Sequence, residues 1–461
     1  MKDMQEHKPF NNKFKHQNKP LVANKGFRKF DNNHEKPHFQ PHHRHHNDYD
    51  DIDDDFDEND EEQDYGKFKN FEKMNRRNET AYGGKHKGGK SIKPADVCVI
   101  ANFRSPTFTG RVGTAILQCG REQHLFFAGS ERRSYGWIKD LPMPEDAAKG
   151  LELPPQAKSR CYVSSIYNFN QEHVGPQDSW VASFDPMNED VSQLRRLQRA
   201  GLVIVPSDKH AQACRKAGIK PQNIKIVPMP VKTKYFNAQA VCPAEYENKK
   251  GYFRIITSGN PLNRKGLEDV LFAYIKEFKA EEKVELIIKL THLPKAKKDF
   301  SYEIADFRKK LGALNSMFAK VTIIDHLMPD NDYAGLLASA DVYVAGNVAF
   351  NSAINVREAV ACGLHVIGAD YLASIANLPM NTVIPVKTNQ VEIGKGELYA
   401  DSPAMKVRKL DAQSLAYTMR KAFNAKDTLR GRKGGVAASF KNTLTWEELA
   451  KLIVPKPKEQ Y

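Results

Sequence analysis

The clearest candidate for chemistry is a loop of small residues between a strand-like run at Val342–Ala345 and a helix-like segment that ends at Gly363. A second β-rich run, Leu364–Ile367, follows directly, so residues 341–370 predict a strand–helix–strand unit. The loop then lies where the carboxyl end of a strand meets the amino end of a helix. Free backbone N–H groups and the helix dipole favour an anion at such a point. The stretch therefore predicts a site for a phosphate or a similar anion.

Three other groups of residues could hold a metal, and each has a simpler interpretation. Residues 41–46 are rich in histidine, but nothing around them fixes a ligand geometry. The acidic run at residues 48–64 is best interpreted as a solvated charge run. Asp330-Asn331-Asp332 precedes a predicted helix and is interpreted as its N-cap. The six cysteines have no paired short spacing, so the sequence predicts no metal site and no disulfide framework.

Composition separates a polar tail from a basic body. The formal net charge is +14; residues 1–95 hold 19 Lys+Arg against 18 Asp+Glu, which leaves 51 against 38, or +13, for residues 96–461. A nucleotide diphosphate, a nucleic acid or an anionic surface could use that field, and solubility alone would also explain it. No run approaches the roughly 20 apolar residues of a membrane-spanning helix. The amino terminus lacks the apolar core of a secretory signal, so we expect a cytoplasmic protein.

The first 92 residues or so are expected to form a disordered tail. They are rich in Asn, Lys, His, Asp and Gly, and they show no sustained period of 2 or 3.6. Such a composition buries too little apolar surface to offset the entropy of ordering. Residues 67–93 are basic with pairs of glycines, which fits either an electrostatic arm or a plain linker.

From Ala95 onward, β-rich runs alternate with helix-like segments, which predicts parallel sheets covered by helices on both faces. Strands of a first series are expected at Val97–Ala101, Leu125–Ala128, Cys161–Ile166, Trp180–Phe184, Leu202–Val205 and Ile224–Pro228. Helices of this series are expected at Val112–Gln118, Glu189–Ala200 and up to Ala217 after an N-cap at Ser207.

A polar segment, Pro243–Lys250, leads to a second series of the same kind. Its strands are expected at Phe253–Thr257, Val284–Leu290, Val321–Ile324, Val342–Ala345 and Leu364–Ile367. Helices are expected at Leu267–Phe278, Ser301–Leu314 and Tyr333–Ala340.

These elements, in this order over residues 96 to 455, resemble the retaining nucleotide-sugar glycosyltransferases of the fourth family, the group 1 glycosyl transferases. The matching residues are Gly110, Val203–Ser207, Ile224–Val231 and Phe236 in the first series, and Ile256–Gly259, Arg264–Leu267, Arg357–Gly363 and Thr445–Ala450 in the second. The resemblance implies an α/β chain of GT-B architecture, with two facing Rossmann-like domains whose sheets are parallel. The predicted parts are a tail at residues 1–94, an acceptor domain at 95–240, a donor domain at 251–435 and a helix at 436–461 that crosses back to the first domain.

The resemblance also implies a donor site in the second domain. Lys265 matches the lysine that contacts the donor diphosphate, and Arg264 lies beside it; these cations would stabilise the charge that grows on the phosphate as the sugar departs. Glu358 matches the carboxylate that holds the ribose hydroxyls. Without the resemblance, Lys265 would be a solvated residue and Glu358 a capping or surface carboxylate. The further donor-binding positions are Gly110, Gly259, Asn260, Ser352, Ala353, Ile354 and Asn355.

Three positions depart from the family pattern. Phe350 stands where the family has its first glutamate, and Asn260 stands where it has an arginine. Phe184-Asp185 replaces the usual His-Asp pair, so His173 or another histidine would have to replace the acceptor-side histidine. Asp185 is the third candidate catalytic residue, with a strand-end cap as the alternative.

The leading hypothesis is a retaining, metal-independent glycosyltransferase with a nucleoside-diphosphate sugar as co-substrate and no other cofactor. The sequence does not identify the acceptor. The net positive charge of residues 96–461 makes a polyanion such as modified DNA one candidate. The alternative is a catalytically inactive GT-B scaffold whose tail mediates binding or assembly, which the three departures motivate.

Overall fold

The computed structural model describes residues 94–133, 137–153, 155–165, 174–187, 191–259, 266–291, 318–346, 352–394 and 404–455. The chain divides into two units, residues 1–89 and 90–461, and every described residue belongs to the second. The predicted tail, with its histidine-rich and acidic runs, lies outside the described residues, as does the expected helix at 301–314. In the described part, no helix is both long enough and apolar enough to cross a membrane.

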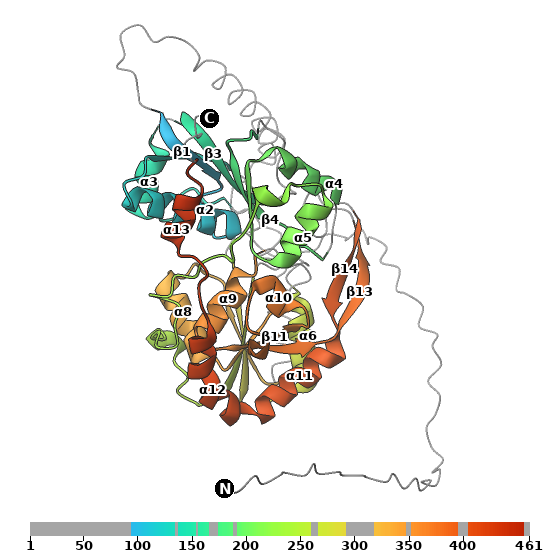
Figure 1. The fold of residues 1–461 in the computed structure, drawn as a ribbon. Coiled ribbons are helices and arrows are strands. Elements are labelled where there is room, and N and C mark those ends of the chain that lie inside the picture. Colours follow the sequence, from blue (N-terminus) through green and yellow to red (C-terminus); the bar gives the residue numbers. More distant parts are fainter. Residues whose placement is uncertain are drawn as a thin grey trace, which may run out of the picture. The chain divides into compact units, whose positions relative to one another are not determined.

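The first sheet has six described strands in the order β2-β1-β3-β4-β5-β6, all parallel (Figure 1). The strands are β1 Ala95–Ala101, β2 Phe127–Glu131, β3 Ala157–Ser165, β4 Ser179–Ser183, β5 Leu202–Val205 and β6 Ile224–Ile226. The accompanying helices are α2 Phe108–Glu122, α3 Glu145–Leu151, α4 Val191–Leu194, α5 Asp208–Lys216 and the short 3₁₀ helices η2 Arg195–Arg199 and η3 Pro221–Asn223. Strands β4 and β5 are almost fully buried, as a sheet covered on both faces requires.

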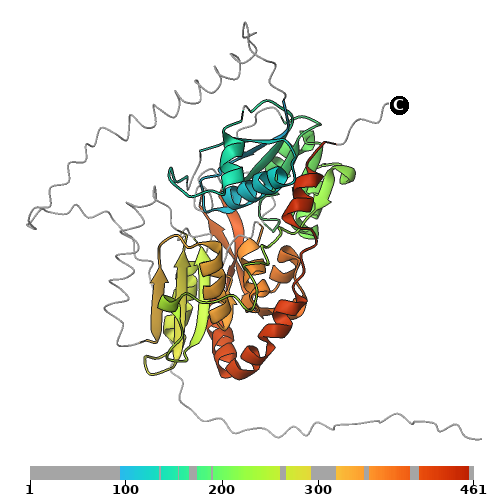
Figure 2. The same ribbon diagram turned by 90° about the vertical axis from the view of Figure 1, so that its left-hand side faces the viewer.

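The second sheet has six described strands in the order β12-β11-β10-β7-β8-β9. The strands are β7 Phe253–Gly259, β8 Val284–Leu290, β9 Lys320–Ile324, β10 Val342–Val344, β11 His365–Ala369 and β12 Val383–Val386. The accompanying helices are η4 Ala244–Tyr246, α6 Leu267–Glu277, α8 Asp330–Ser339, α9 Ile354–Ala361, α10 Leu372–Ala376, η7 Met380–Thr382, α11 Ala412–Asn424 and α12 Lys426–Ser439. Helices α11 and α12 pack against β11 (Figures 1 and 2). Read from β9, this is the doubly wound order, in which the connections reverse direction between β7 and β10.

Two elements connect parts of the chain that are distant in sequence. Helix α13, Trp446–Leu452, packs against α2, and its Trp446 and Leu449 belong to the core of the first sheet (Figure 1). Its amino end is fixed by a capping box between Thr445 and Glu448. The antiparallel hairpin of β13, Thr388–Ile393, and β14, Met405–Leu410, was not predicted; its Val407 is buried with the core residues around β4 and β5.

Several expected boundaries were wrong for physical reasons. Helix α8 begins at Asp330 after Pro329, so the acidic triplet forms its first turn and is not its N-cap. Helix α2 begins at Phe108, four residues earlier than predicted, because Gly110 tolerates a tight approach: an added Cβ would lie 2.0 Å from the Ser105 carbonyl oxygen. Ser207 does precede α5, but its hydroxyl bonds to His210 Nδ1 and makes no cap bond.

Candidate functional site

The point where the connections of the second sheet reverse is built from glycine backbone. Gly259 ends β7, and Gly346 follows β10 by two residues. Gly266, at the start of α6, has a positive φ of 58°, and a Cβ there would lie 2.1 Å from the Gly346 carbonyl oxygen. Only glycine permits so close an approach of two backbones in this conformation. The loops that follow β7 and β10 therefore meet at the switch point, where open α/β sheets bind their ligands.

A hydroxyl network fills the space beside this point. Ser258 Oγ accepts hydrogen bonds from Tyr333 Oη at 2.9 Å and from Asn355 Nδ2 at 3.2 Å, and it lies 2.8 Å from Tyr343 Oη. Because two donors use both lone pairs of the serine oxygen, its own hydrogen is directed at Tyr343. Burial raises the pKa of Tyr343 to about 12 and that of Tyr333 well above its usual range, so both phenols stay neutral. The network fixes Asn355, and with it the start of α9, against β7.

The strongest electrostatic feature is an ion pair between Glu358 on α9 and Arg111 on α2. Arg111 Nη2 donates to Glu358 Oε1, and Nη1 donates to Oε2 at 3.3 Å and to Asn355 Oδ1 at 3.4 Å. Glu358 is only 1% exposed. Asp330 lies 3.9 Å from Arg111 and 2.9 Å from Lys232, so charges alternate along the row Glu358, Arg111, Asp330 and Lys232. A bidentate pair of this kind is geometrically specific.

Burial and pairing act in opposite directions on these groups. Burial raises the pKa of Glu358, and Arg111 lowers it by less, so the net pKa lies above the ordinary value. Burial also works against the charge of Arg111, but Glu358 and Asp330 more than offset it and raise the pKa of the guanidinium. For Asp330, the cations Arg111 and Lys232 outweigh burial and lower the pKa of the carboxyl. Arg111 is therefore the charge that favours the ionised form of the buried glutamate.

The predicted phosphate-facing segment lies at the start of α9. Ala353 is its N-cap in the left-handed conformation, with φ of 50°, and no side chain caps this end. A non-glycine residue in this region is uncommon, and such strain is often found at binding sites. Ser352 is buried, and the Ile354 side chain packs into the core of the first sheet, so only backbone atoms of Ile354 could serve a ligand. Asn355 joins Ser258 to Arg111 through its amide.

The two predicted glycines have packing roles of their own. A Cβ on Gly110 would overlap the backbone oxygens of Ser105 and Asn102, which accounts for glycine there without a ligand. The Gly259 carbonyl accepts from Thr291 N at 2.8 Å, which extends the pairing of β7 with β8. Donor binding at both glycines stays a prediction.

Other predicted site residues lie outside the described part of the chain. These are Asn260, Arg264 and Lys265, which lie between β7 and α6 in the sequence, Phe350, which lies between β10 and α9, and His173.

Asp185 follows β4 and makes a local contact. Its side chain is buried, and Oδ1 accepts from Met187 N at 2.9 Å, as a strand-end cap does. Phe184 is a core residue whose ring packs edge-on against His210 at 5.0 Å. His210 is fully buried, with its ring nitrogens bonded to Ser207 Oγ and the Phe184 carbonyl, so it anchors α5 to the end of β4. A catalytic role for Asp185 stays a prediction.

The sequence reasoning assigned no role to the partners of Glu358 and Asn355. Arg111 carried a signal, since it lies between the matching Gly110 and the helix predicted from Val112. Ser258, Tyr333 and Lys232 carried none, because only the fold brings them to the switch point.

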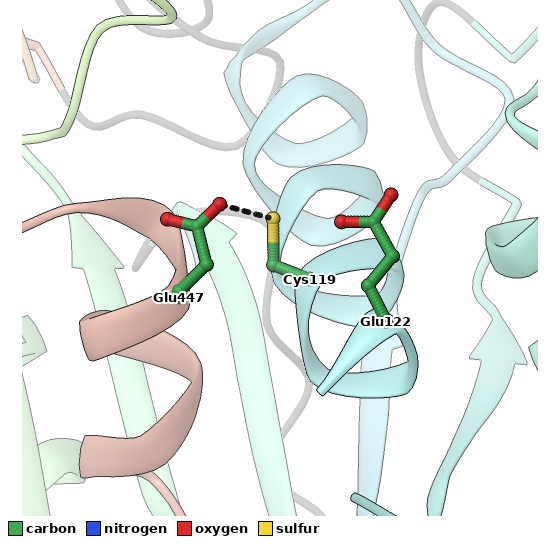
Figure 3. A group of neighbouring side chains, drawn as sticks. All are labelled: Cys119, Glu122 and Glu447. Atoms are coloured by element: carbon green, nitrogen blue, oxygen red, sulfur yellow. Dashed lines mark hydrogen bonds between the residues drawn. The ribbon is translucent and has the colours of Figure 1, made fainter. Parts of the chain in front are cut away.

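A second cluster of possible ligand atoms lies between α2 and α13. One ligand atom each from Cys119, Glu122 and Glu447 falls within 4.8 Å of the others (Figure 3). Cys119 Sγ donates to Glu447 Oε1 at 3.8 Å, and Gln123 Nε2 donates to the Glu447 carbonyl at 3.1 Å. Burial, reinforced by Glu447, raises the pKa of the Cys119 thiol to about 12. The thiol is therefore neutral, and these contacts fasten α13 to α2.

Comparisons with known proteins identify the fold. No family model and no curated protein sequence matches the chain. Solved structures are similar to it. Sucrose-phosphate synthase from Thermosynechococcus elongatus is 15% identical with a TM-score of 0.52, over 77% of this chain and 96% of that one. WaaG, a glycosyltransferase involved in lipopolysaccharide biosynthesis, is 16% identical with a TM-score of 0.52, over 78% of this chain and 100% of that one. Trehalose-6-phosphate synthase OtsA is similar at 12% identity and a TM-score of 0.50, over 78% and 100% of the two chains.

At these identities the likeness shows the fold. The predicted GT-B fold, with two Rossmann-like parallel sheets, is confirmed, and so is the resemblance in fold to GT-B glycosyltransferases. The predicted domain boundaries and the individual site residues stay predictions.

Proposed function

We propose that this protein is a glycosyltransferase that moves a sugar from a nucleoside-diphosphate sugar to an acceptor with retention of configuration. The observation that carries the proposal is the buried Glu358 carboxylate on α9, beside the switch point of the second sheet. A carboxylate can accept from both hydroxyls of a ribose. The sequence likeness of Glu358 to the ribose-binding glutamate of the fourth family and the shared fold support the same role.

The diphosphate would lie against the start of α9 and the loop after β7. The uncapped backbone N–H groups around Asn355 suit an anion. Arg264 and Lys265 belong to the loop that Gly259 and Asn260 begin, and their cations would stabilise the departing phosphate. Together with Gly110, these groups would do the work that a metal ion does elsewhere, so no metal or further cofactor is required. Retention would follow if a leaving-group oxygen takes the acceptor proton on the face from which the diphosphate departs.

Donor binding would change the ion-pair partner of Arg111. Its guanidinium pairs with both oxygens of Glu358. Ribose hydroxyls that bind Glu358 must share or replace that contact, and a diphosphate provides Arg111 with another anion nearby. Because Arg111 is on α2 and Glu358 is on α9, the exchange would couple donor binding to the contact between the two sheets.

The acceptor would bind on the side of the first sheet, near Asp185. The excess of cations in the body of the chain supports a polyanionic acceptor, such as DNA with modified bases. We place the activity in the cytoplasm.

The test combines donor binding and turnover. Melting temperature is measured with a panel of nucleoside-diphosphate sugars, followed by release of nucleoside diphosphate from the sugar that binds. Glu358→Gln should weaken binding about tenfold, and Lys265→Ala should abolish release. Glu392→Gln removes an exposed carboxylate on β13 and serves as the matched control, with no change expected. If no donor raises the melting temperature, or if Glu358→Gln binds as the parent does, the donor assignment is wrong.

One observation favours an inactive GT-B scaffold as the second candidate. Phe184 occupies the family's histidine position and is a buried core residue. Nucleotide binding without any release of nucleoside diphosphate, across the panel and with acceptors present, would select the scaffold.

A further inference from the structure

Cations are concentrated in one short part of the first sheet. Residues 191–225 contain eight Lys and Arg but one acidic residue, Asp208. Their net charge is therefore 8 − 1 = +7, more than half of the +13 carried by residues 96–461. Such a concentration exceeds what solubility requires, because a modest net charge spread over the surface is sufficient for that.

The fold puts these residues on adjacent elements. Arg195 and Arg199 are on η2, which contacts α4, and α4 contacts α5 (Figure 1). Helix α5 in turn contacts β6, an edge strand of the sheet. The apolar side chains of the same segment, such as Leu197 and Cys214, are buried in the core. The cations therefore occupy the solvent side of amphipathic elements. We name this surface the basic face; its exposed members are Arg195, Arg199, Lys209, Arg215, Lys216, Lys220 and Lys225.

Four cations of the basic face are not paired with a described carboxylate as other cations of the first sheet are. Lys158 pairs with Asp96 at 2.7 Å, Arg104 with Glu131 at 2.9 Å, and Lys149 with Glu145. Among the described residues, Arg195, Arg199, Arg215 and Lys220 form no ion pair. The field of these four cations is thus available to a partner.

The side-chain types of the basic face restrict the classes of partner that it can bind. Residues 191–225 contain no Phe, Tyr or Trp, so the face has no platform on which unpaired bases could stack. None of the large exposed apolar side chains of the described chain lies in this segment, so it has no wedge for the acyl region of a membrane. Exposed Gln212 and Gln222 can donate to phosphate oxygens between the cations. A duplex, with one charge per roughly 1.7 Å of axis, matches a surface that offers only cations and amides.

We propose that the basic face docks onto the phosphate backbone of a double-stranded nucleic acid. The inference rests on the proposed function only for the identity of the acceptor, because docking requires neither the donor site nor turnover. Recognition by cations and amides alone is independent of base sequence. If about four phosphates are contacted, the logarithm of the affinity should fall with the logarithm of salt concentration with a slope near −4.

The experiment measures binding of the full chain to a labelled duplex oligonucleotide by fluorescence anisotropy at several salt concentrations. The test variant carries Arg195→Gln, Arg199→Gln, Arg215→Gln and Lys220→Gln. Its matched control loses the same charge at exposed positions around the second sheet, through Lys250→Gln, Lys276→Gln, Lys279→Gln and Lys283→Gln. Melting temperature verifies that both variants fold, and donor binding is measured in parallel so that loss of docking and loss of the donor site are distinguished.

The test variant should lose at least tenfold in affinity, and its salt slope should become shallower by about 3. The control should retain the affinity of the parent within about twofold. Equal losses in both variants would overturn the proposal, because only the total charge would then matter. Tighter binding to the single strand of the same sequence, or binding to phosphatidylglycerol vesicles without binding to the duplex, would also overturn it.

Discussion

The ion pair at Glu358 and the basic face use the same kind of cation in opposite ways. Arg111 is held by two oxygens of a carboxylate that is almost fully buried, and Asp330 lies behind it. Arg195 and Arg199 are exposed, with no ion pair among the described residues. A buried charge depends on one partner at one geometry, since removing that partner leaves a charge without water or counterion. Exposed charges act together through a field that salt weakens. The first arrangement provides geometric specificity, and the second provides attraction.

The largest effect is expected from Arg111→Met, which leaves the buried Glu358 carboxylate without its cation. The unfolding free energy in urea near neutral pH should fall by about 3 kcal/mol. Burial already raises the pKa of Glu358, and Arg111 lowers it, so the variant should raise that pKa further. The loss of stability should therefore shrink as pH falls and Glu358 takes up a proton.

Arg104→Met provides the comparison for that change. Its pair with Glu131 is more exposed, so the expected loss is only about 1 kcal/mol. Equal losses for the two variants would remove the distinction between buried and exposed pairs.

Lys289 extends the comparison of buried with exposed cations to a buried cation whose hydrogen-bond partners are backbone carbonyls. Its Nζ donates to the carbonyls of Leu290 and His326 at 2.7 Å, and burial lowers the pKa of the ammonium to about 8, from an ordinary value of 10.5. Between these values the unfolded chain binds a proton that the folded chain has released, so stability rises with pH. Relative to Lys289→Met, the parent should gain about 3 kcal/mol across this interval. Parallel stability curves for the two proteins would contradict the expectation.

Ser258→Ala addresses the neutral part of the buried network. The substitution removes the oxygen that accepts from Tyr333 and Asn355 and leaves buried donors without a partner. A loss of about 1.5 kcal/mol is expected in urea unfolding. Ser374→Ala, at an exposed serine whose hydroxyl donates to the Tyr371 carbonyl at the start of α10, should cost little, and a similar loss there would show that Ser258 has no special role.

The smallest effect on stability is expected from the basic face. Neutralising Arg195, Arg199, Arg215 and Lys220 should change the unfolding free energy by about 0.5 kcal/mol or less. Removal of repulsion between neighbouring cations would make the change a gain. A loss above about 2 kcal/mol would show that these side chains stabilise the fold.

Some features could be predicted from the sequence because neighbours along the chain decide them. Strands such as Val284–Leu290 are short runs in which five of the seven residues are aliphatic, and the structure begins and ends β8 at these two residues. The alternation of strands with helices is sufficient to predict covered parallel sheets. The excess of cations in residues 96–461 is also a property of composition. Local pattern was insufficient where a long contact competed with it, as at Asp330, which Lys232 binds within the first turn of α8.

The sequence by itself therefore determined the fold class, the order along the chain of most strands of the two sheets and Glu358 as a candidate ribose partner. Only the tertiary structure decided that Arg111 holds this carboxylate, since 247 residues separate the two in sequence. It also decided that Ser258, Tyr333 and Asn355 meet at one point and that the cations of residues 191–225 lie on adjacent elements. The physical reason is that periodicity along a chain reports which side of an element is buried. The partner on that side depends on how distant elements pack.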